Sequence, residues 1–186
     1  YAELLERVNQ IAHYLTTIGL KRGSRIGIYS RKCTDSVIAI LAILSTEYVF
    51  VPITRLLKPE QVRHIIDDCG ISCLITDKEK METVKAIDFK GKIISYEASP
   101  ESDVSFVEIC KCYTGEIECN IAGHNNAAVT YTFGSTGNPR GIVIDHRALI
   151  DGARIVSKYL DIRKEDVISG ILSFNLDYGL NQLFVA

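Results

Sequence analysis

The segment Tyr131–Gly141, which reads YTFGSTGNPRG, concentrates groups that can bind an anion. Glycines let the backbone bend back and expose its N–H groups, while hydroxyls and a guanidinium supply further donors. A concave backbone of this kind suits the oxygens of a polyphosphate. The residues of these types are Gly134, Gly137, Gly141, Thr132, Ser135, Thr136 and Arg140. This chemistry alone leaves two interpretations open, a phosphate-binding loop and an ordinary hairpin loop.

The flanking residues indicate that the loop joins two strands. The apolar run Ala127–Tyr131 precedes it and the β-branched run Ile142–Ile144 follows it. The loop is not a Walker A motif, because Pro139 stands where GxxxxGK[ST] requires glycine. A GxGxxG pattern is not present in the loop either.

The order of residues in the loop resembles the signature loop of the adenylate-forming enzymes, which usually reads [YF]TSG[ST]TGxPKG. These are AMP-forming acyl-CoA and aryl-CoA ligases, amino-acid adenylation domains and luciferases. Two positions depart from that pattern, since Phe133 replaces a usual Ser and Arg140 a usual Lys. Phe133 removes a hydroxyl donor, and Arg140 keeps the charge as a planar fork.

The resemblance implies that the loop holds the β- and γ-phosphates of ATP, with Mg²⁺ sharing the charge. Arg140 would steer or neutralise the phosphates. The residues so implied are Thr132, Gly134, Ser135, Thr136, Gly137 and Arg140.

A second stretch, Ser173–Gly179, reads SFNLDYG and follows an expected strand, where an open α/β sheet places its ligands. In the adenylate-forming enzymes the matching segment lines the carboxylate-substrate pocket, which implicates Phe174, Asp177, Tyr178 and Gly179. Amino-acid-activating members often read SFxFDxS, and their Asp holds the substrate ammonium. Some acyl ligases share the YGLNQL that follows Asp177 here. The class of carboxylic acid therefore stays undecided. Asp177 has a further possible role, which is to cap a helix that begins at Tyr178.

The remaining pattern predicts an α/β fold, a layered and mostly parallel sheet with flanking helices, because helical and β-branched segments alternate. The resemblance makes this the N-terminal part of the adenylate-forming enzyme fold. We expect helices over residues 4–18, 34–44 with Thr34 as N-cap, 59–69, 78–87 and 146–160. In the last of these Leu149, Ile150, Ala153, Val156 and Leu160 should face inward. Strands are expected over 25–29, 48–53, 73–76, 93–96 and 167–173.

Three parts of one truncated N-terminal domain are predicted. A first α/β part spans 1–96, and a variable connection with some short structure spans 97–126. The loop hairpin, a helix, a strand and the start of the pocket helix occupy 127–186. The resemblance includes ILAILSTEYVFVPI, where Glu47 replaces a usual Gly, and PEQVRHIIDDCGISCLITD. Both ends of the chain are expected to be cut.

Composition disfavours several classes of protein. A net charge of −2 offers no basic stripe, so nucleic acid is not an expected partner. The longest apolar run, Val37–Leu44, is too short to span a bilayer. Six cysteines are expected as reduced thiols in a cytoplasmic protein. Cys110, Cys112, Cys119 and His124 lack zinc-knuckle spacing, so no metal site formed by protein ligands is expected.

The resemblance implies an AMP-forming ligase. ATP activates a carboxylic acid as an acyl-adenylate, and coenzyme A or phosphopantetheine then displaces AMP. The catalytic Lys of that family lies on a C-terminal lid, so no catalytic residue is expected in this chain, which alone should not turn over. One alternative is an amino-acid adenylation domain that loads a carrier protein. Another is a degenerate, non-catalytic binding domain, which Phe133, Glu47 and Arg140 would favour.

Overall fold

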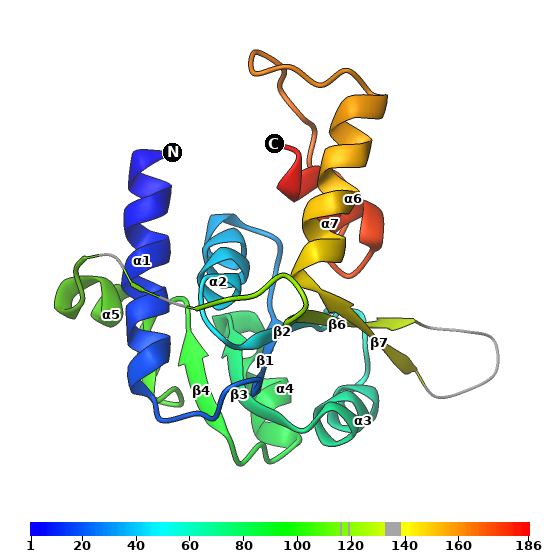
Figure 1. Ribbon diagram of the computed structural model, residues 1–186. Helices are drawn as coiled ribbons and strands as arrows, with labels where there is room; N and C mark the ends of the chain where they lie inside the picture. Colours follow the sequence, from blue (N-terminus) through cyan, green and yellow to red (C-terminus); the bar gives the residue numbers. More distant parts are fainter. Residues whose placement is uncertain (116, 119, 133–138) are drawn as a thin grey trace.

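The computed structural model describes residues 1–115, 117–118, 120–132 and 139–186 (Figure 1). Its centre is a seven-stranded sheet in the order β5-β4-β3-β1-β2-β6-β7. Every neighbouring pair is parallel except β6 and β7, which are antiparallel. The strands are β1 Arg25–Tyr29, β2 Val49–Pro52, β3 Ile71–Thr76, β4 Lys92–Ser95, β5 Val104–Ser105, β6 Asn126–Thr132 and β7 Arg140–Asp145. The predicted mostly parallel sheet is confirmed.

Helices cover both faces of the sheet (Figure 1). Helices α1, α2 and α5 lie on one face, and α3 and α4 lie on the other. The helices are α1 Ala2–Thr17, α2 Thr34–Leu44, α3 Pro59–Cys69, α4 Met81–Ala86, α5 Phe106–Cys112, α6 His146–Tyr159 and α7 Asp177–Phe184, with a 3₁₀ turn, η1, at Lys78–Lys80. Helices α6 and α7 rise over β6 and β7 on the face of the sheet that carries α1 and α2 (Figure 1).

Two hydrophobic clusters lie on opposite faces of the sheet. Successive side chains of a strand point to opposite faces. Phe50 of β2 accordingly enters the cluster under α1 and α2, while its neighbours Val49 and Val51 enter the cluster over α3 and α4. A strand that is buried on both faces is a continuous apolar run, which is typical of a parallel sheet.

Two helix boundaries show how local chemistry fixes the elements. Helix α2 begins at Thr34, but its N-cap is Cys33, whose backbone is extended and which forms a capping box with Ser36. The prediction of Thr34 as the cap was therefore wrong by one residue. Helix α3 ends as predicted at Gly70, whose φ of 60° is the left-handed conformation that glycine adopts without strain.

The predicted strand at residues 167–173 was wrong. No described strand pairs with this segment, and its apolar residues Val167 and Ile171 are exposed. A β-branched pattern shows a preference for extended backbone, but a strand also needs a neighbour with which to form a ladder.

The connection at 97–126 contains the short elements β5 and α5, and β5 extends the sheet beside β4. The expected inward face of residues 146–160 needs correction. In α6 no residue is fully buried. Leu149 packs against the cluster under α1 and α2, but Ile150 and Leu160, which were expected to face inward, are exposed. Among the described residues, no helix combines the length and apolar character that a membrane crossing requires.

Candidate functional site

The carboxyl ends of the parallel strands meet at one edge of the sheet, and both predicted binding segments start from that edge or border it. Strand β6 runs parallel to β2 through the pair Phe50 and Ala128, so its last residue, Thr132, extends past the end of β2. The predicted phosphate loop begins there. The backbone after β1 and β2 emerges at the same edge.

A cleft of about 680 Å³ opens at this edge where the chain changes direction. From β1 the chain passes into α2 on one face, and from β2 it passes into α3 on the opposite face. The crevice between two such strands is where open α/β sheets bind ligands. Two sets of residues bound the cleft at the strand ends: those after β1 (Ser30, Arg31, Lys32) and those after β2 (Ile53, Thr54, Arg55, Leu56). Lys80, Ile171 and three residues of the predicted acid pocket segment (Ser173, Phe174, Asn175) complete the wall, over an apolar floor that includes Ile28, Ile40 and Pro52.

Charged side chains beside the cleft are tied together by ion pairs. The Arg31 guanidinium donates to Glu97 at 2.8 Å, and this hydrogen bond raises the pKa of Arg31. Glu79 contacts Arg55 and lies 3.9 Å from Arg31. The backbone N–H of Arg31 donates to the carboxylate of Asp77 at 2.6 Å. These contacts fix the segments after β1 and β2 against the segments after β3 and β4.

The hairpin brings two predicted phosphate ligands together. Thr132 and Arg140 are directly opposite each other as the last described pair of β6 and β7. Both are exposed, and neither side chain has a hydrogen-bond or ion-pair partner among the described residues. Gly134, Ser135, Thr136 and Gly137, which were predicted to bind phosphate, and Phe133 lie outside the residues that the structure describes.

Tyr131 fastens the base of this hairpin to α3. Its hydroxyl donates to Asp68 at 2.6 Å, and burial together with this bond raises the pKa of Tyr131. The tyrosine ring lies across Gly141, where an added Cβ would come within 3.2 Å of the ring. Gly141 therefore makes room for the aromatic side chain on the neighbouring strand.

The predicted acid pocket segment is built around Phe174 and Gly179. Phe174 is buried in the cluster under α1 and α2. A Cβ on Gly179 would lie only 1.9 Å from the backbone oxygen of Ser173, so the close approach of these two backbones requires glycine. Tyr178 is exposed. Helix α7 begins at Asp177 with Leu176 as N-cap, so the alternative in which Asp177 caps a helix from Tyr178 was wrong.

Sequence reasoning missed the basic residues of the cleft. Arg31, Lys32, Arg55 and Lys80 all border it. The polar run Ser30–Lys32, which follows a buried strand directly, is the signal that could have pointed to them. Glu47, in contrast, lies before β2 at the opposite edge of the sheet, 3.4 Å from Arg22. Its departure from the family pattern therefore does not concern the cleft.

The described cysteines show no arrangement that would bind a metal. Within the described part of the chain, no three His, Cys, Asp or Glu side chains form a group that could hold a metal ion; Cys119 lies outside that part. Burial raises the pKa of the Cys73 thiol to about 12, so this thiol stays protonated and unreactive at neutral pH.

Comparison with known proteins gives matches across the whole chain. A linear gramicidin synthase of Brevibacillus parabrevis and gramicidin S synthase 1 of Brevibacillus brevis are each 27% identical over 186 residues, the full chain. The chain spans only 2% and 16% of their respective lengths. Among solved structures, a putative long-chain-fatty-acid CoA ligase from Rhodopseudomonas palustris superposes with a TM-score of 0.89 at 18% identity, over 99% of this chain and 47% of that one.

This structural likeness shows the fold, and a family model identifies the sequence. The model described as "AMP-binding enzyme" matches residues 1–186. The resemblance of the loop Tyr131–Gly141 to the adenylate-forming signature therefore agrees with the match of the complete sequence. The chain belongs to the AMP-binding enzyme family, the family of the adenylate-forming enzymes.

Proposed function

We propose that the intact protein uses ATP and Mg²⁺ to activate a carboxylic acid as an acyl-adenylate and then transfers the acyl group to coenzyme A or phosphopantetheine. The observation that carries the proposal is the position of the signature hairpin at the carboxyl edge of the sheet that also forms the switch-point cleft. Nucleotide and acid would then approach each other from adjacent segments.

The described hydrogen-bond donors at the end of the hairpin are suited to bind the phosphates of a nucleoside triphosphate. The Thr132 hydroxyl and the Arg140 guanidinium are exposed on opposite strands and are not engaged with other described side chains. A guanidinium can donate two parallel hydrogen bonds to phosphate oxygens. Arg140 would therefore hold and neutralise the β- and γ-phosphates, and Thr132 would add a neutral donor. Gly134, Ser135, Thr136 and Gly137 are proposed to complete this set.

Bound Mg²⁺ would supply charge neutralisation at the phosphates. The first reaction step is attack of the acid's carboxylate oxygen on the α-phosphorus, with pyrophosphate as leaving group. Such a step needs accurate positioning and charge stabilisation more than a protein nucleophile. No residue of this chain is therefore assigned as a nucleophile.

Phe174, Asp177, Tyr178 and Gly179 are proposed to border the acid. Phe174 gives the pocket an apolar wall that is held in the core. Gly179 lets α7 approach Ser173, which sets where the first turn of α7 begins. An acyl or aryl acid would use the apolar wall, and an amino acid would in addition pair its ammonium with Asp177.

Amino-acid activation is the second candidate within this reaction class. The gramicidin synthases, at 27% identity over the whole chain, favour it, as does Asp177 in the first turn of α7. The product would then pass to the phosphopantetheine of a carrier protein. A non-catalytic binding domain is the remaining alternative, and it depends on Phe133 and Arg140 alone, because Glu47 lies at the opposite edge.

Acid-dependent ATP–pyrophosphate exchange in the intact protein tests the proposal, with fatty, aryl and amino acids compared in parallel. Exchange only with amino acids, and its loss in Asp177→Ala, would identify an ammonium anchor. Exchange with fatty or aryl acids that survives Asp177→Ala would identify an acyl ligase. A folded protein that shows no exchange with any acid would refute ligase activity and favour the binding domain.

Substitution of Arg140 tests the phosphate site separately. We expect Arg140→Met to lower the exchange rate about 10- to 100-fold, because a hydrogen bond to a charged group contributes about 1.5–3 kcal/mol. Arg163→Met is the matched control, since Arg163 is an exposed arginine whose guanidinium pairs with Asp161 in the loop after α6. Equal rates in the two variants would remove Arg140 from the site.

A further inference from the structure

We infer that Lys32 is a positioning residue for the carboxylic-acid pocket, because it fastens the segment that carries Phe174 to the end of β1. The inference rests on the proposed function, since the pocket is the one assigned there. Lys32 would not touch the reacting atoms. It would act through the backbone that leads to Phe174 and α7.

Three contacts of one ammonium group support this role. The Nζ atom of Lys32 donates to the carbonyl oxygen of Gly170 at 2.7 Å and to that of Leu172. It also lies 4.4 Å from the centroid of the Phe174 ring. An ammonium has three donors and no acceptor, and it is attracted to the face of an aromatic ring. All three partners belong to the same short segment, so this one side chain fixes both its backbone and its aromatic residue.

Among the described contacts of residues 167–172, one other hydrogen bond reaches a different element: the Leu172 N–H donates to Gln182 of α7 at 3.3 Å, which holds the segment to α7 and not to the sheet. Val167 is 97% exposed and Ile171 is 81% exposed, and no described strand pairs with either. Beyond this point the chain is anchored by burial, because Phe174 and Leu180 enter the cluster under α1 and α2. Lys32 therefore supplies the described polar attachment that ties this part of the segment to the end of β1.

The other end of the attachment is rigid. Lys32 lies between the carboxyl end of β1, a buried central strand, and Cys33, the N-cap of α2. The backbone of Lys32 is therefore held on both sides, and its three contacts fix the otherwise flexible side chain. Burial lowers the pKa of Lys32, in keeping with an ammonium partly withdrawn from water by the segment it contacts.

Because Lys32 lies at the cleft, its attachment to the segment should affect binding of the acid. Lys32 and Phe174 border the same cleft, and Asp177 begins α7 three residues after Phe174. Loss of the attachment would let the segment move away from the cleft without opening the sheet. The acid site should then weaken, while the hairpin that is proposed to bind ATP, on the far side of β2, keeps its structure.

The test compares Lys32→Met, Lys32→Arg and the control Lys21→Met in the intact protein. Methionine keeps an unbranched side chain and removes the ammonium. Lys21 is an exposed lysine whose side chain has no hydrogen-bond or ion-pair partner among the described residues. Two quantities are measured: amide hydrogen exchange of residues 170–180, and the KM values for acid and for ATP in pyrophosphate exchange.

For Lys32→Met we expect amide exchange in residues 170–180 to become about tenfold faster, while exchange in β1 to β4 stays unchanged. The KM for the acid should rise about tenfold and the KM for ATP should stay within about twofold. Lys32→Arg should recover most of both effects, because it retains a cation that can donate to carbonyl oxygens. Lys21→Met should behave as wild type.

The possible failures are distinguishable. A Lys32→Met protein with a normal rate of pyrophosphate exchange and an unchanged KM for the acid would overturn the role of Lys32 and leave the proposed function intact. An equal rise in both KM values, together with faster amide exchange throughout the sheet, would show a general structural role and also overturn it. A wild-type protein inactive with every acid would overturn the proposed function, and with it the assignment of Lys32 to an acid pocket.

Discussion

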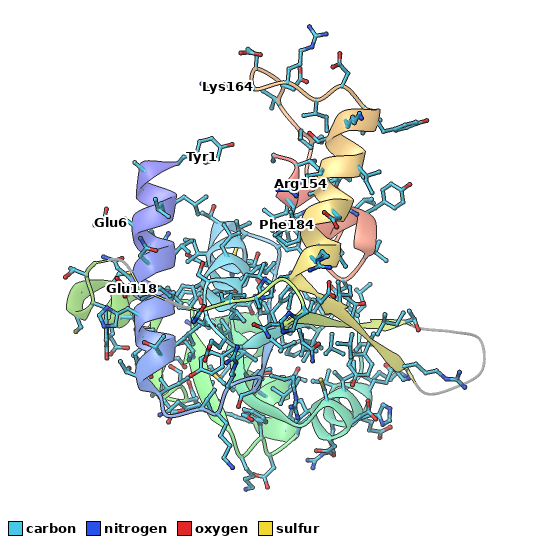
Figure 2. All side chains as sticks on the ribbon, in the orientation of Figure 1. Tyr1, Glu6, Glu118, Arg154, Lys164 and Phe184 are labelled. Carbon is cyan, nitrogen blue, oxygen red and sulfur yellow. The ribbon has the colours of Figure 1, made fainter. Side chains whose placement is uncertain are left out.

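The sheet from β1 to β5 with its covering helices and the arm at residues 146–186 differ in how they bury their apolar residues. In the sheet, both faces of β1, β2 and β3 lie in hydrophobic clusters. In the arm, no residue of α6 is fully buried, and Val167, Ile171 and Tyr178 are exposed. Figure 2 shows Arg154 on α6 near Phe184 at the end of α7, with Lys164 at the tip of the arm away from the sheet.

This difference places most of the stability in one part of the molecule and the predicted binding segments in another. Burial of apolar surface is the main source of folding free energy, so the sheet must provide most of the stability. The predicted acid pocket lies instead in the arm, of which Phe174 and Leu180 reach the core while α6 and residues 167–171 are sparsely packed. The predicted phosphate loop lies on a two-stranded extension of the sheet. Segments of low local stability are the ones that can adapt when a ligand binds.

The largest expected effect is on the sheet. Phe50 is fully buried in β2, and we expect Phe50→Ala to lower the free energy of unfolding by about 3–5 kcal/mol because it leaves a cavity. Ile155 on α6 is 68% exposed, and Ile155→Ala should change the free energy by less than about 0.5 kcal/mol. Urea denaturation of both variants measures the contrast. Similar losses would show that the arm is as tightly packed as the sheet.

The second effect lies within the arm. Because the Cβ of Gly179→Ala would collide with the backbone of Ser173, we expect α7 to lose about 1–3 kcal/mol of its docking free energy. Native-state hydrogen exchange of the α7 amides is the measurement. Gly152→Ala is the matched control, since a Cβ there meets Asn181 at an ordinary contact distance of 3.5 Å and alanine favours the helix. Protection of α7 in Gly179→Ala equal to wild type would contradict the close approach.

A smaller effect is expected where the hairpin joins the sheet. Tyr131→Phe removes the hydrogen bond to Asp68 and should lower the free energy of unfolding by about 0.5–1.5 kcal/mol at neutral pH. Tyr159→Phe is the control, because the Tyr159 side chain is exposed and its hydroxyl has no hydrogen-bond partner among the described residues. Equal urea midpoints for the two variants would mean that the bond to α3 does not stabilise the hairpin.

The smallest effect concerns pH at the start of α6. Burial lowers the pKa of His146 below its ordinary value of 6.5, with Asp145 acting in the opposite direction. The unfolded chain therefore binds the proton more readily, and stability should fall as the pH drops from above 6.5 towards the lower folded pKa. Urea midpoints from pH 8 to 5 measure this dependence. The pH dependence of the urea midpoint should be weaker in His146→Gln. It should be unchanged in the control His124→Gln, because His124 is exposed.

The sequence was informative wherever a local pattern determines local structure. The apolar runs around Tyr131–Gly141 predicted the β6–β7 hairpin, and Pro59 and Gly70 marked the ends of α3. The prediction of a strand at 167–173 was wrong because a strand needs a neighbouring strand to pair with, which composition does not reveal. The prediction that Ile150 and Leu160 face inward was wrong for a related reason, since periodicity identifies an apolar face of a helix but not what covers it.

The candidate site was predictable only in part. The loop and the segment Ser173–Gly179 were found from their residue order. The cleft was missed because its wall is assembled from the ends of β1 and β2 and from residues near Phe174, which are distant in sequence. Lys32 in particular is an ordinary lysine in the sequence, and only the tertiary fold places its ammonium against the carbonyl groups of Gly170 and Leu172.

The strand order also has a consequence for synthesis. Strand β2 lies between β1 and β6, and its partner β6 is made only after β3, β4 and β5. Until residues 126–132 leave the ribosome, the run Val49–Pro52 is an unpaired edge of an otherwise assembled sheet. An apolar edge strand invites pairing with other chains. Docking of the β6–β7 hairpin thus covers this buried apolar strand.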